Sequence, residues 1–386
     1  MLTKNIKFKN YNVRSNISKV KREFKKFVSK ENEILSSLSL KYKYAYSKRI
    51  IKKYKNFSKL QIIGIGGSIL GTEAIYSFLR DKIKKKFFFI NTIKNETLKN
   101  KGKKILNLVV SKSGNTLETI SNSNIFINKN DKNIFITENK NSYLNNLAKN
   151  LKAEIIHHNN FIGGRYSVLS EVGMLPAELA GLNPKKFKQL NLLIKKKNFV
   201  NGLVNNVANT ISLIKKKRYA SIILNYDEKS ENLFKWYQQL IAESLGKKSK
   251  GILPVISSMP KDNHSLMQLY LDGPKKNFYT FFHVLGENSL KIKNNKILPS
   301  HKHLKNKNLT KILYSQKLAT EEVFLRKKIP FRSFEVIKRN EKTLGELFCF
   351  FILETILLGR SLNVNPFDQP SVELIKEETK KILLRS

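Results

Sequence analysis

The stretch Leu60-Gln-Ile-Ile-Gly-Ile-Gly-Gly-Ser-Ile-Leu-Gly71 begins with an apolar run and passes into a cluster of glycines. A short apolar run is typical of a strand that is buried on both faces of a parallel sheet. The glycines mark a turn from strand to helix, where an anion can approach backbone N–H groups and the positive end of a helix dipole. The stretch therefore predicts an α/β unit with an anion-binding loop, in which Gly67 and Ser68 contact the ligand.

Two familiar glycine motifs do not fit this loop. A dinucleotide-binding fingerprint that starts at Gly64 needs glycine at position 69, where the chain has Ile69. A P-loop that starts at Gly66 needs lysine after Gly71, where the chain has Thr72. The loop therefore indicates an anion site without a nucleotide, and we expect no cofactor. A tight turn with no ligand is the alternative.

Further apolar runs, separated by turns and helical patterns, follow along the chain. They lie at 87–90, 105–110, 133–137 and 155–156 in the first half, and at 219–224, 251–256, 278–284 and 331–337 in the second. Helical patterns in the second half lie at about 230–245, 309–326 and 342–361. This alternation predicts an α/β fold of two doubly wound parallel-sheet domains. We assign 1–45 to an N-terminal helical arm, 46–190 to the first domain, and 191–386 to the second domain with its C-terminal helix.

The composition is that of a folded chain with an unusual charge. Of the 386 residues, 41% are hydrophobic and 26% are charged, and the formal net charge is +44. The lysines are scattered along the chain and do not form one stripe with interleaved aromatic residues. A general compositional bias therefore explains the charge better than specific nucleic-acid binding, which stays an alternative. A positive surface of this kind also attracts small anions.

The sequence gives no sign of membrane insertion or secretion. The apolar stretch from Leu347 to Leu358 includes Glu354 and is shorter than a membrane span, so we expect a buried core helix. The N-terminal residues lack the apolar segment of a secretory signal. The one cysteine, Cys349, has no partner for a disulfide within the chain. We expect a cytoplasmic protein that does not contact a membrane.

A second polar loop, Ser111-Lys-Ser-Gly-Asn-Thr116, also lies between a predicted strand and a predicted helix. Its hydroxyl groups and helix N–H groups can donate to the oxygens of a phosphate, while Lys112 balances the charge. An ordinary helix N-cap at Ser113 is the alternative, and the two roles are compatible. Because such loops at neighbouring parallel strands face one crevice, we expect this loop to lie near Ser68.

A third motif, Gly163-Gly-Arg-Tyr-Ser167, places an arginine directly after two glycines. The glycines allow a close approach to a ligand, and Arg165 offers a permanently charged, planar group for a developing oxyanion. An arginine on a surface turn is the alternative.

A fourth motif, Gln239-Leu-Ile-Ala-Glu-Ser-Leu-Gly-Lys247, has the pattern of a helix end. Gln239 and Glu243 share one face of this helix, which we expect to end at Gly246. A carboxylate in the last turn faces the negative end of the helix dipole, which favours its protonated form and suits a general base. An ordinary glutamate at a helix end is the alternative.

Two further segments carry candidate proton-transfer groups. His264 lies in Asp262-Asn-His-Ser265 and can move protons between oxygens. Lys376 ends the segment Asn365-Pro-Phe-Asp-Gln-Pro-Ser-Val-Glu-Leu-Ile-Lys376, where a turn leads into a predicted helix. A plain hydrogen-bonding histidine and one lysine among many are the alternatives. The histidines show no ligand spacing, so we predict no metal site.

Taken together, these segments resemble the glucose-6-phosphate isomerase family, over about residues 60 to 378. The resemblance is carried by their order: GIGGS, SKSGNT, GGRYSVLSEVGMLP, QQLIAESLGK, DNHSLMQL and NPFDQPSVELIK. It implies two sugar-isomerase (flavodoxin-like) domains and a homodimer whose active site is completed by the second subunit. It also implies an aldose–ketose isomerase of glycolysis and gluconeogenesis that interconverts glucose 6-phosphate and fructose 6-phosphate through a cis-enediolate.

The resemblance assigns a role to each candidate residue. Glu243 resembles the base that moves the proton between C1 and C2, and Arg165 resembles the arginine that stabilises the enediolate. His264, from the partner subunit, and Lys376 match the residues that open the sugar ring. The substrate contacts implied by the resemblance are Gly67, Ser68, Ser111, Lys112, Ser113, Thr116, Gln239 and Gln369.

Three alternatives for the function stay open at this point. Gly114 stands where many family members carry a bulkier residue, and the chain is short for the family, so mannose 6-phosphate is a possible additional substrate. A non-catalytic sugar-phosphate sensor needs only the phosphate loops, which makes Arg165, Glu243, His264 and Lys376 superfluous. Nucleic-acid binding is the third alternative.

Overall fold

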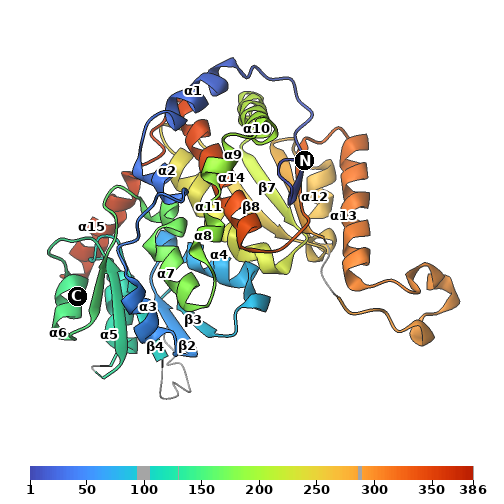
Figure 1. The fold of residues 1–386 in the computed structure, drawn as a ribbon. Coiled ribbons are helices and arrows are strands. Elements are labelled where there is room, and N and C mark those ends of the chain that lie inside the picture. Colours follow the sequence, from blue (N-terminus) through green and yellow to red (C-terminus); the bar gives the residue numbers. More distant parts are fainter. Residues whose placement is uncertain (94–104, 129, 286–288, 386) are drawn as a thin grey trace.

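The computed structural model describes residues 1–93, 105–128, 130–285 and 289–385, and these form two five-stranded sheets (Figure 1). The first sheet has the order β3-β2-β4-β5-β6 and is parallel throughout. Its strands are β2 (Lys59–Ile63), β3 (Lys86–Ile90), β4 (Ile105–Val110), β5 (Lys132–Thr137) and β6 (Glu154–His157). In chain order this is the flavodoxin-like arrangement 2-1-3-4-5.

The second sheet repeats this arrangement. Its parallel strands are β7 (Ala220–Asn225), β8 (Leu253–Ser258), β9 (Asn277–Val284) and β10 (Phe331–Val336), in the order β8-β7-β9-β10. The fifth position is taken by β1 (Ile6–Lys9), which pairs with β10 in the antiparallel direction. The predicted α/β fold with two doubly wound sheets is confirmed, and the halves share a strand order that their sequences do not reveal.

Helices cover both sheets (Figure 1). The helices among residues 1–179 are α1 (Ser18–Val28), α2 (Glu33–Ser37), α3 (Lys48–Tyr54), α4 (Leu70–Phe78), α5 (Leu117–Phe126), α6 (Tyr143–Asn150) and α7 (Glu171–Leu179). Those that follow are α8 (Pro184–Phe187), α9 (Leu190–Leu193), α10 (Lys197–Lys215), α11 (Glu231–Leu245), α12 (Met267–Asp272), α13 (Leu309–Arg326), α14 (Glu341–Ser361) and α15 (Ser371–Leu383).

The N-terminal segment is more closely joined to the second sheet than the predicted helical arm implies. Helix α1 lies in this segment and buries Val20, Phe24 and Phe27, but β1 was not predicted. The hydroxyl of Thr3 also donates to Glu346 Oε2 at 2.7 Å, which ties the N-terminus to α14. The domain ranges 46–190 and 191–386 stay predictions.

The core of the second half is built around α14, whose residues from Leu344 to Leu358 are all buried. This confirms the predicted core helix. Burial raises the pKa of the Cys349 thiol to about 12. Among the described residues, no helix combines the length and the apolar character that a membrane span requires.

A buried ion pair joins α14 to the second sheet. Arg332 of β10 and Glu354 of α14 are each 1% exposed and form a hydrogen-bonded pair. Asn206 and the hydroxyl of Tyr237 also donate to the Glu354 carboxylate, and Thr280 accepts from Arg332 Nε at 2.9 Å. Because a charge in such a site depends on its partner, losing either group leaves the other buried and unpaired.

We predict that Arg332→Met lowers the free energy of unfolding by about 3–5 kcal/mol, since it strands the Glu354 carboxylate in the core. Urea unfolding followed by circular dichroism measures the change. Lys53→Ala is the control, because Lys53 and Glu154 form a pair whose side chains are 53% and 34% exposed, and its loss costs less than about 1 kcal/mol. Equal effects of the two substitutions would contradict the prediction.

Candidate active site

Two glycine loops touch each other at the edge of the first sheet. Gly67 follows β2, and a Cβ atom added to it would lie 2.2 Å from the carbonyl carbon of Gly164. Gly66 has φ +55°, and a Cβ atom there would lie 2.7 Å from Gln239 Nε2. Glycine is required at Gly67 because backbone occupies the space of a methyl group, and it is favoured at Gly66 by the positive φ. The loop predicted to bind an anion therefore also packs against the backbone that carries Arg165.

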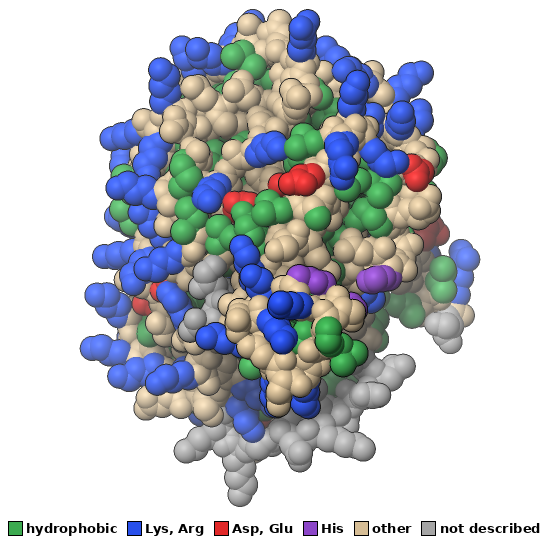
Figure 2. All heavy atoms as spheres, turned by 90° about the vertical axis from the view of Figure 1, so that its right-hand side faces the viewer, with side chains coloured by type: hydrophobic (Ala, Val, Ile, Leu, Met, Phe, Trp, Pro, Cys, Tyr) green, Lys and Arg blue, Asp and Glu red, His purple; other side chains and the backbone are tan. Residues whose placement is uncertain are grey.

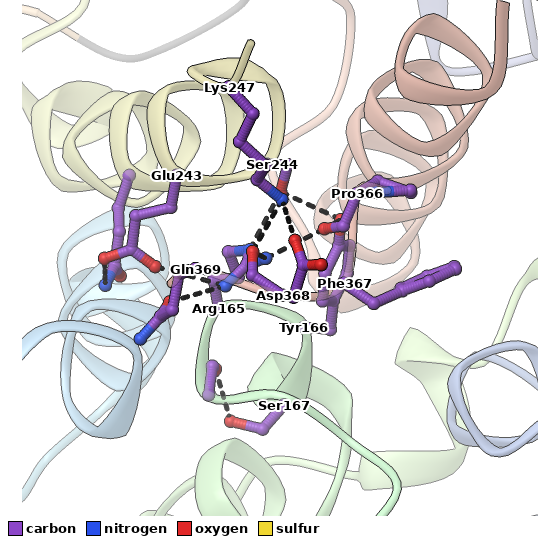
Figure 3. Close-up of polar contacts among 12 residues, drawn as sticks. Arg165, Tyr166, Ser167, Glu243, Ser244, Lys247, Pro366, Phe367, Asp368 and Gln369 are labelled. Carbon is purple, nitrogen blue, oxygen red and sulfur yellow. Dashed lines mark hydrogen bonds and ion pairs between the residues drawn. The ribbon is translucent and has the colours of Figure 1, made fainter. Parts of the chain in front are cut away.

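Arg165 lies at the centre of this site, with its side chain 3% exposed (Figure 3). Its Nε donates to Ser244 Oγ at 2.8 Å. Its Nη1 donates to Gln369 Oε1 at 2.7 Å and to Glu243 Oε2 at 3.3 Å. Its Nη2 donates to the carbonyl oxygens of Pro366 at 2.8 Å and Asp368 at 3.0 Å. A guanidinium has five N–H donors, and all five are used.

The two predicted residues of α11 meet as expected. Gln239 Nε2 donates to Glu243 Oε1 at 2.8 Å, while Glu243 Oε2 faces the guanidinium of Arg165. The Glu243 side chain is 27% exposed, so it borders open space while both of its oxygens are held. Helix α11 ends at Leu245 with Gly246 as its C-cap, as predicted. Gln239 Oε1 is buried and has no hydrogen-bond partner among the described residues.

Buried side chains also form hydrogen bonds with the segment that carries Arg165 and with its surroundings. The indole N–H of Trp236 donates to the backbone oxygen of Arg165 at 3.1 Å, and Tyr166 donates its hydroxyl to Pro366 O at 2.9 Å. Burial raises the pKa of Tyr166, which keeps the hydroxyl a donor. Arg165 and Tyr166 lie in a short 3-10 helix, Gly164–Leu169. Lys188 donates to Leu169 O at the end of this helix, and burial lowers the pKa of this lysine to about 7.

The predicted phosphate loop is preformed at the end of β4. Ser111 Oγ and Thr116 Oγ1 lie 2.9 Å apart, and Gly114, at φ +67°, turns the backbone between them. The alternative role of Ser113, as the N-cap of the helix, is wrong: Thr116 is the N-cap of α5, and no side chain caps the helix. Ser113 is exposed and accepts from the Asn115 N–H at 3.2 Å. The first N–H groups of α5 therefore have no side-chain acceptor.

The Lys112 side chain contacts residues outside this loop. Its Nζ donates to Asn160 O at 2.8 Å and lies 3.5 Å from Glu138 Oε1. The loop is nevertheless next to the glycine loop, because Ile63 of β2 pairs with Val109 of β4. A Cβ atom on Gly64 would lie 3.0 Å from Val110 O. Both predicted anion loops thus lie at the point where the strand order reverses, the usual ligand position in such sheets.

His264 and Lys376 are both exposed in the single chain. His264 is exposed in the short helix Lys261–His264. Lys376 is exposed on α15, where its Nζ pairs with Glu373 at 2.7 Å. Helix α15 buries none of its residues. Both positions are open for contact with another molecule.

The sequence reasoning missed the residues that hold Arg165 in place. Ser244, Tyr166 and Lys247 stand inside the quoted motifs, but their partners lie more than 70 positions away in the chain. The nearest available signal was their position beside Glu243 and Arg165. Among the described residues, no group of three His, Cys, Asp or Glu side chains is arranged to hold a metal ion.

The comparison with protein families agrees with this geometry. The family model for phosphoglucose isomerase matches residues 4–385. The chain belongs to the phosphoglucose isomerase family. Two similar members are a probable glucose-6-phosphate isomerase of Methanococcus maripaludis, 34% identical over 84% of this chain and 78% of the relative, and a glucose-6-phosphate isomerase of Methanocaldococcus jannaschii, 31% identical over 87% and 86%.

Solved structures show the same fold as this phosphoglucose isomerase family member. A hypothetical protein of Thermus thermophilus matches with a TM-score of 0.80 at 24% identity, over 95% of this chain and 94% of the other. A glucose-6-phosphate isomerase of Chlamydia trachomatis matches with a TM-score of 0.72 at 19% identity, over 95% and 77%. The two-sheet architecture is therefore that of known relatives.

We predict that Gly67→Ala lowers kcat/KM for sugar-phosphate isomerisation by about a hundredfold, because the new methyl group displaces the backbone that carries Arg165. Steady-state assays measure the change. Gly163→Ala is the matched control in the facing loop, since its nearest contact would be Tyr166 Cδ2 at an ordinary 3.7 Å. Full activity of Gly67→Ala, or an equal loss in the control, would contradict the prediction.

Proposed function

We propose that the chain interconverts glucose 6-phosphate and fructose 6-phosphate, with Glu243 as the proton carrier and Arg165 as the electrostatic stabiliser. The reaction is an aldose–ketose isomerisation. The observation that supports these roles most directly is the pair itself: a partly exposed carboxylate lies 3.3 Å from Nη1 of a buried guanidinium. A base beside a fixed positive charge is the arrangement that proton abstraction next to a carbonyl requires.

Glu243 removes the proton from C2 of the open aldose. The electron pair of the broken C–H bond forms the C1–C2 double bond, and the C1 carbonyl oxygen takes up negative charge. Glu243, now protonated, returns the proton to C1 as the oxygen on C2 becomes the carbonyl, and the proton of the C2 hydroxyl passes to the oxygen on C1, which becomes the hydroxyl. The proton thus leaves one carbon and arrives at the next without an external base. Gln239, which holds Glu243 Oε1 at 2.8 Å, keeps the carboxylate directed during both transfers.

Arg165 stabilises the charge that develops on the cis-enediolate. Its Nε and Nη2 donate to fixed acceptors, whereas Nη1 donates to the side chains of Gln369 and Glu243. Those two side chains are the acceptors that a substrate oxygen replaces most readily. The guanidinium therefore stays in place, and its Nη1 donates to the substrate in place of Gln369 and Glu243. A preorganised donor of this kind needs no rearrangement at the moment of reaction.

The phosphate of the substrate binds at the loops after β2 and β4. Gly67 and Ser68 supply backbone and hydroxyl donors, and Ser111, Ser113 and Thr116 supply further hydroxyl groups. The uncapped N-terminus of α5 adds N–H donors and the positive end of its dipole. Lys112 and the scattered surface cations supply long-range attraction. Figure 2 shows Lys and Arg side chains spread over the viewed face, with few acidic side chains among them.

Ring opening uses His264 and Lys376, and the site is shared between two copies of the chain. Both residues are exposed in the single chain. Helix α15 also carries exposed apolar side chains at Leu374, Ile375 and Ile382, which favours burial against a second copy. We place the homodimer in the cytoplasm, where a buried, unpaired cysteine such as Cys349 stays reduced.

No observation favours a second function. A non-catalytic sensor of sugar phosphates does not require a carboxylate paired with a buried guanidinium, as Glu243 is with Arg165. The scattered cations in Figure 2 form no single stripe of the kind that nucleic-acid binding favours.

We predict that Glu243→Gln lowers kcat on glucose 6-phosphate by about a hundredfold to ten-thousandfold, because an amide cannot carry the proton. KM stays near the wild-type value, since the phosphate loops are intact. A coupled assay for fructose 6-phosphate measures both parameters. Glu231→Gln, at the partly exposed start of the same helix, is the control. Substantial turnover in Glu243→Gln would exclude Glu243 as the base.

We predict that mixing Glu243→Gln with His264→Leu restores activity to about one quarter of the wild-type level, since a mixed two-fold dimer contains one site with both native residues. Each variant alone stays far less active. The subunits are mixed under conditions that exchange them, and analytical ultracentrifugation checks that dimers form. A purely monomeric wild type, or mixed dimers without restored activity, would refute the shared site.

A further inference from the structure

The turn from Asn365 to Gln369 supplies three of the acceptors that hold Arg165. They are the carbonyl oxygens of Pro366 and Asp368 and the side chain of Gln369. Yet this turn lies largely at the surface, because Asn365, Phe367 and Asp368 are exposed. An exposed loop is mobile unless other contacts fix it. The position of the buried Arg165 side chain therefore depends on the contacts that hold the exposed turn 365–369 in place.

Lys247 contacts this turn with all of its donors (Figure 3). Its Nζ donates to Asn365 O, to Asp368 O at 2.6 Å and to Asp368 Oδ1 at 2.7 Å. An ammonium group has three N–H donors, so none remains for another ligand. The Lys247 side chain is only 11% exposed. Its hydrogen bond to Asp368 lowers the pKa of that carboxyl group, which keeps it ionised at neutral pH.

The contacts of Lys247 and Arg165 converge on one atom. Asp368 O accepts from Lys247 Nζ at 2.6 Å and from Arg165 Nη2 at 3.0 Å. Lys247 follows Gly246, the C-cap of the helix that carries Glu243. The segment 243–247 therefore places the Glu243 carboxylate on one side of Arg165. Through Lys247, it also holds the carbonyl oxygen of Asp368 on the other side.

We propose that Lys247 is a positioning residue for the isomerase reaction, which locks the turn 365–369 so that Arg165 keeps its Nη1 edge toward Glu243 and the enediolate. Lys247 touches no reacting atom in this scheme. It acts through Asp368 O and Asn365 O on the guanidinium. The inference rests on the proposed roles of Arg165 and Glu243. It adds Lys247, which links the end of the helix that carries Glu243 to the turn that accepts hydrogen bonds from Arg165.

Replacing Lys247 by methionine keeps the aliphatic stem and removes the three donors. We expect kcat to fall by about tenfold to a hundredfold through misplacement of Arg165. KM for glucose 6-phosphate changes by less than about threefold, because the phosphate loops after β2 and β4 do not involve Lys247. Lys247→Arg restores part of the lost kcat, since it keeps the charge and the donors.

Lys250→Met is the matched control. Lys250 lies in the same loop, and its Nζ donates to Leu362 O at 2.8 Å, outside the turn. We expect its kcat to stay near the wild-type value. Asp368→Asn gives a second comparison: it weakens one of the three contacts, so it costs less than Lys247→Met, and the double variant is no worse than Lys247→Met alone.

Backbone amide hydrogen exchange provides a readout that does not depend on activity. We expect faster exchange at residues 365–369 in Lys247→Met than in Lys250→Met, with unchanged exchange in the strands of the first sheet. Unchanged kcat and unchanged exchange in Lys247→Met would overturn the inference, as would a rise in KM that accounts for the whole loss. A wild type with no isomerase activity would instead refute the proposed function, while the exchange experiment would still test the turn.

Discussion

Burying the guanidinium of Arg165 imposes a condition on the whole molecule, because each N–H of a buried guanidinium needs an acceptor. The arginine belongs to the first half of the chain. Its acceptors belong to the end of α11 and to the turn after α14, both in the second half. If the two halves separated at this point, the Arg165 guanidinium would be exposed to solvent or left without its hydrogen-bond acceptors. The acceptors of Nε and Nη2 are a buried serine and two backbone oxygens, which hold that part of the guanidinium in place.

The fold was predictable wherever a segment carries its own signal. Strands such as β2 and β4 are buried on both faces, so their apolar runs are visible in the sequence, and glycine marks their ends. Strand β1 was not predicted because Ile6-Lys-Phe-Lys9 alternates with lysine and is short. It is a strand only because β10 offers a free edge, a tertiary fact that local sequence does not contain.

The site was predictable as a set of residue types, not as a set of contacts. Glycines, an arginine and a carboxylate in ordered motifs pointed to Gly67, Arg165 and Glu243, and the chain brings these together. The identities of the acceptors around Arg165 were not accessible, since a carbonyl oxygen such as Pro366 O leaves no mark in a sequence. His264 and Lys376 differ again, because both side chains are exposed in the single chain.

The pairing of β1 with β10 also constrains how the chain is made. Ile6 pairs with Val336, and Thr3 bonds to Glu346 across 343 positions of sequence. During synthesis the first sheet has all of its strands once residue 157 has left the ribosome, whereas the first ten residues wait for almost the entire chain. Contacts between such distant residues form late and slow the final folding step. Residues 3 to 9 are thus synthesised long before their partners and are among the last to reach their place.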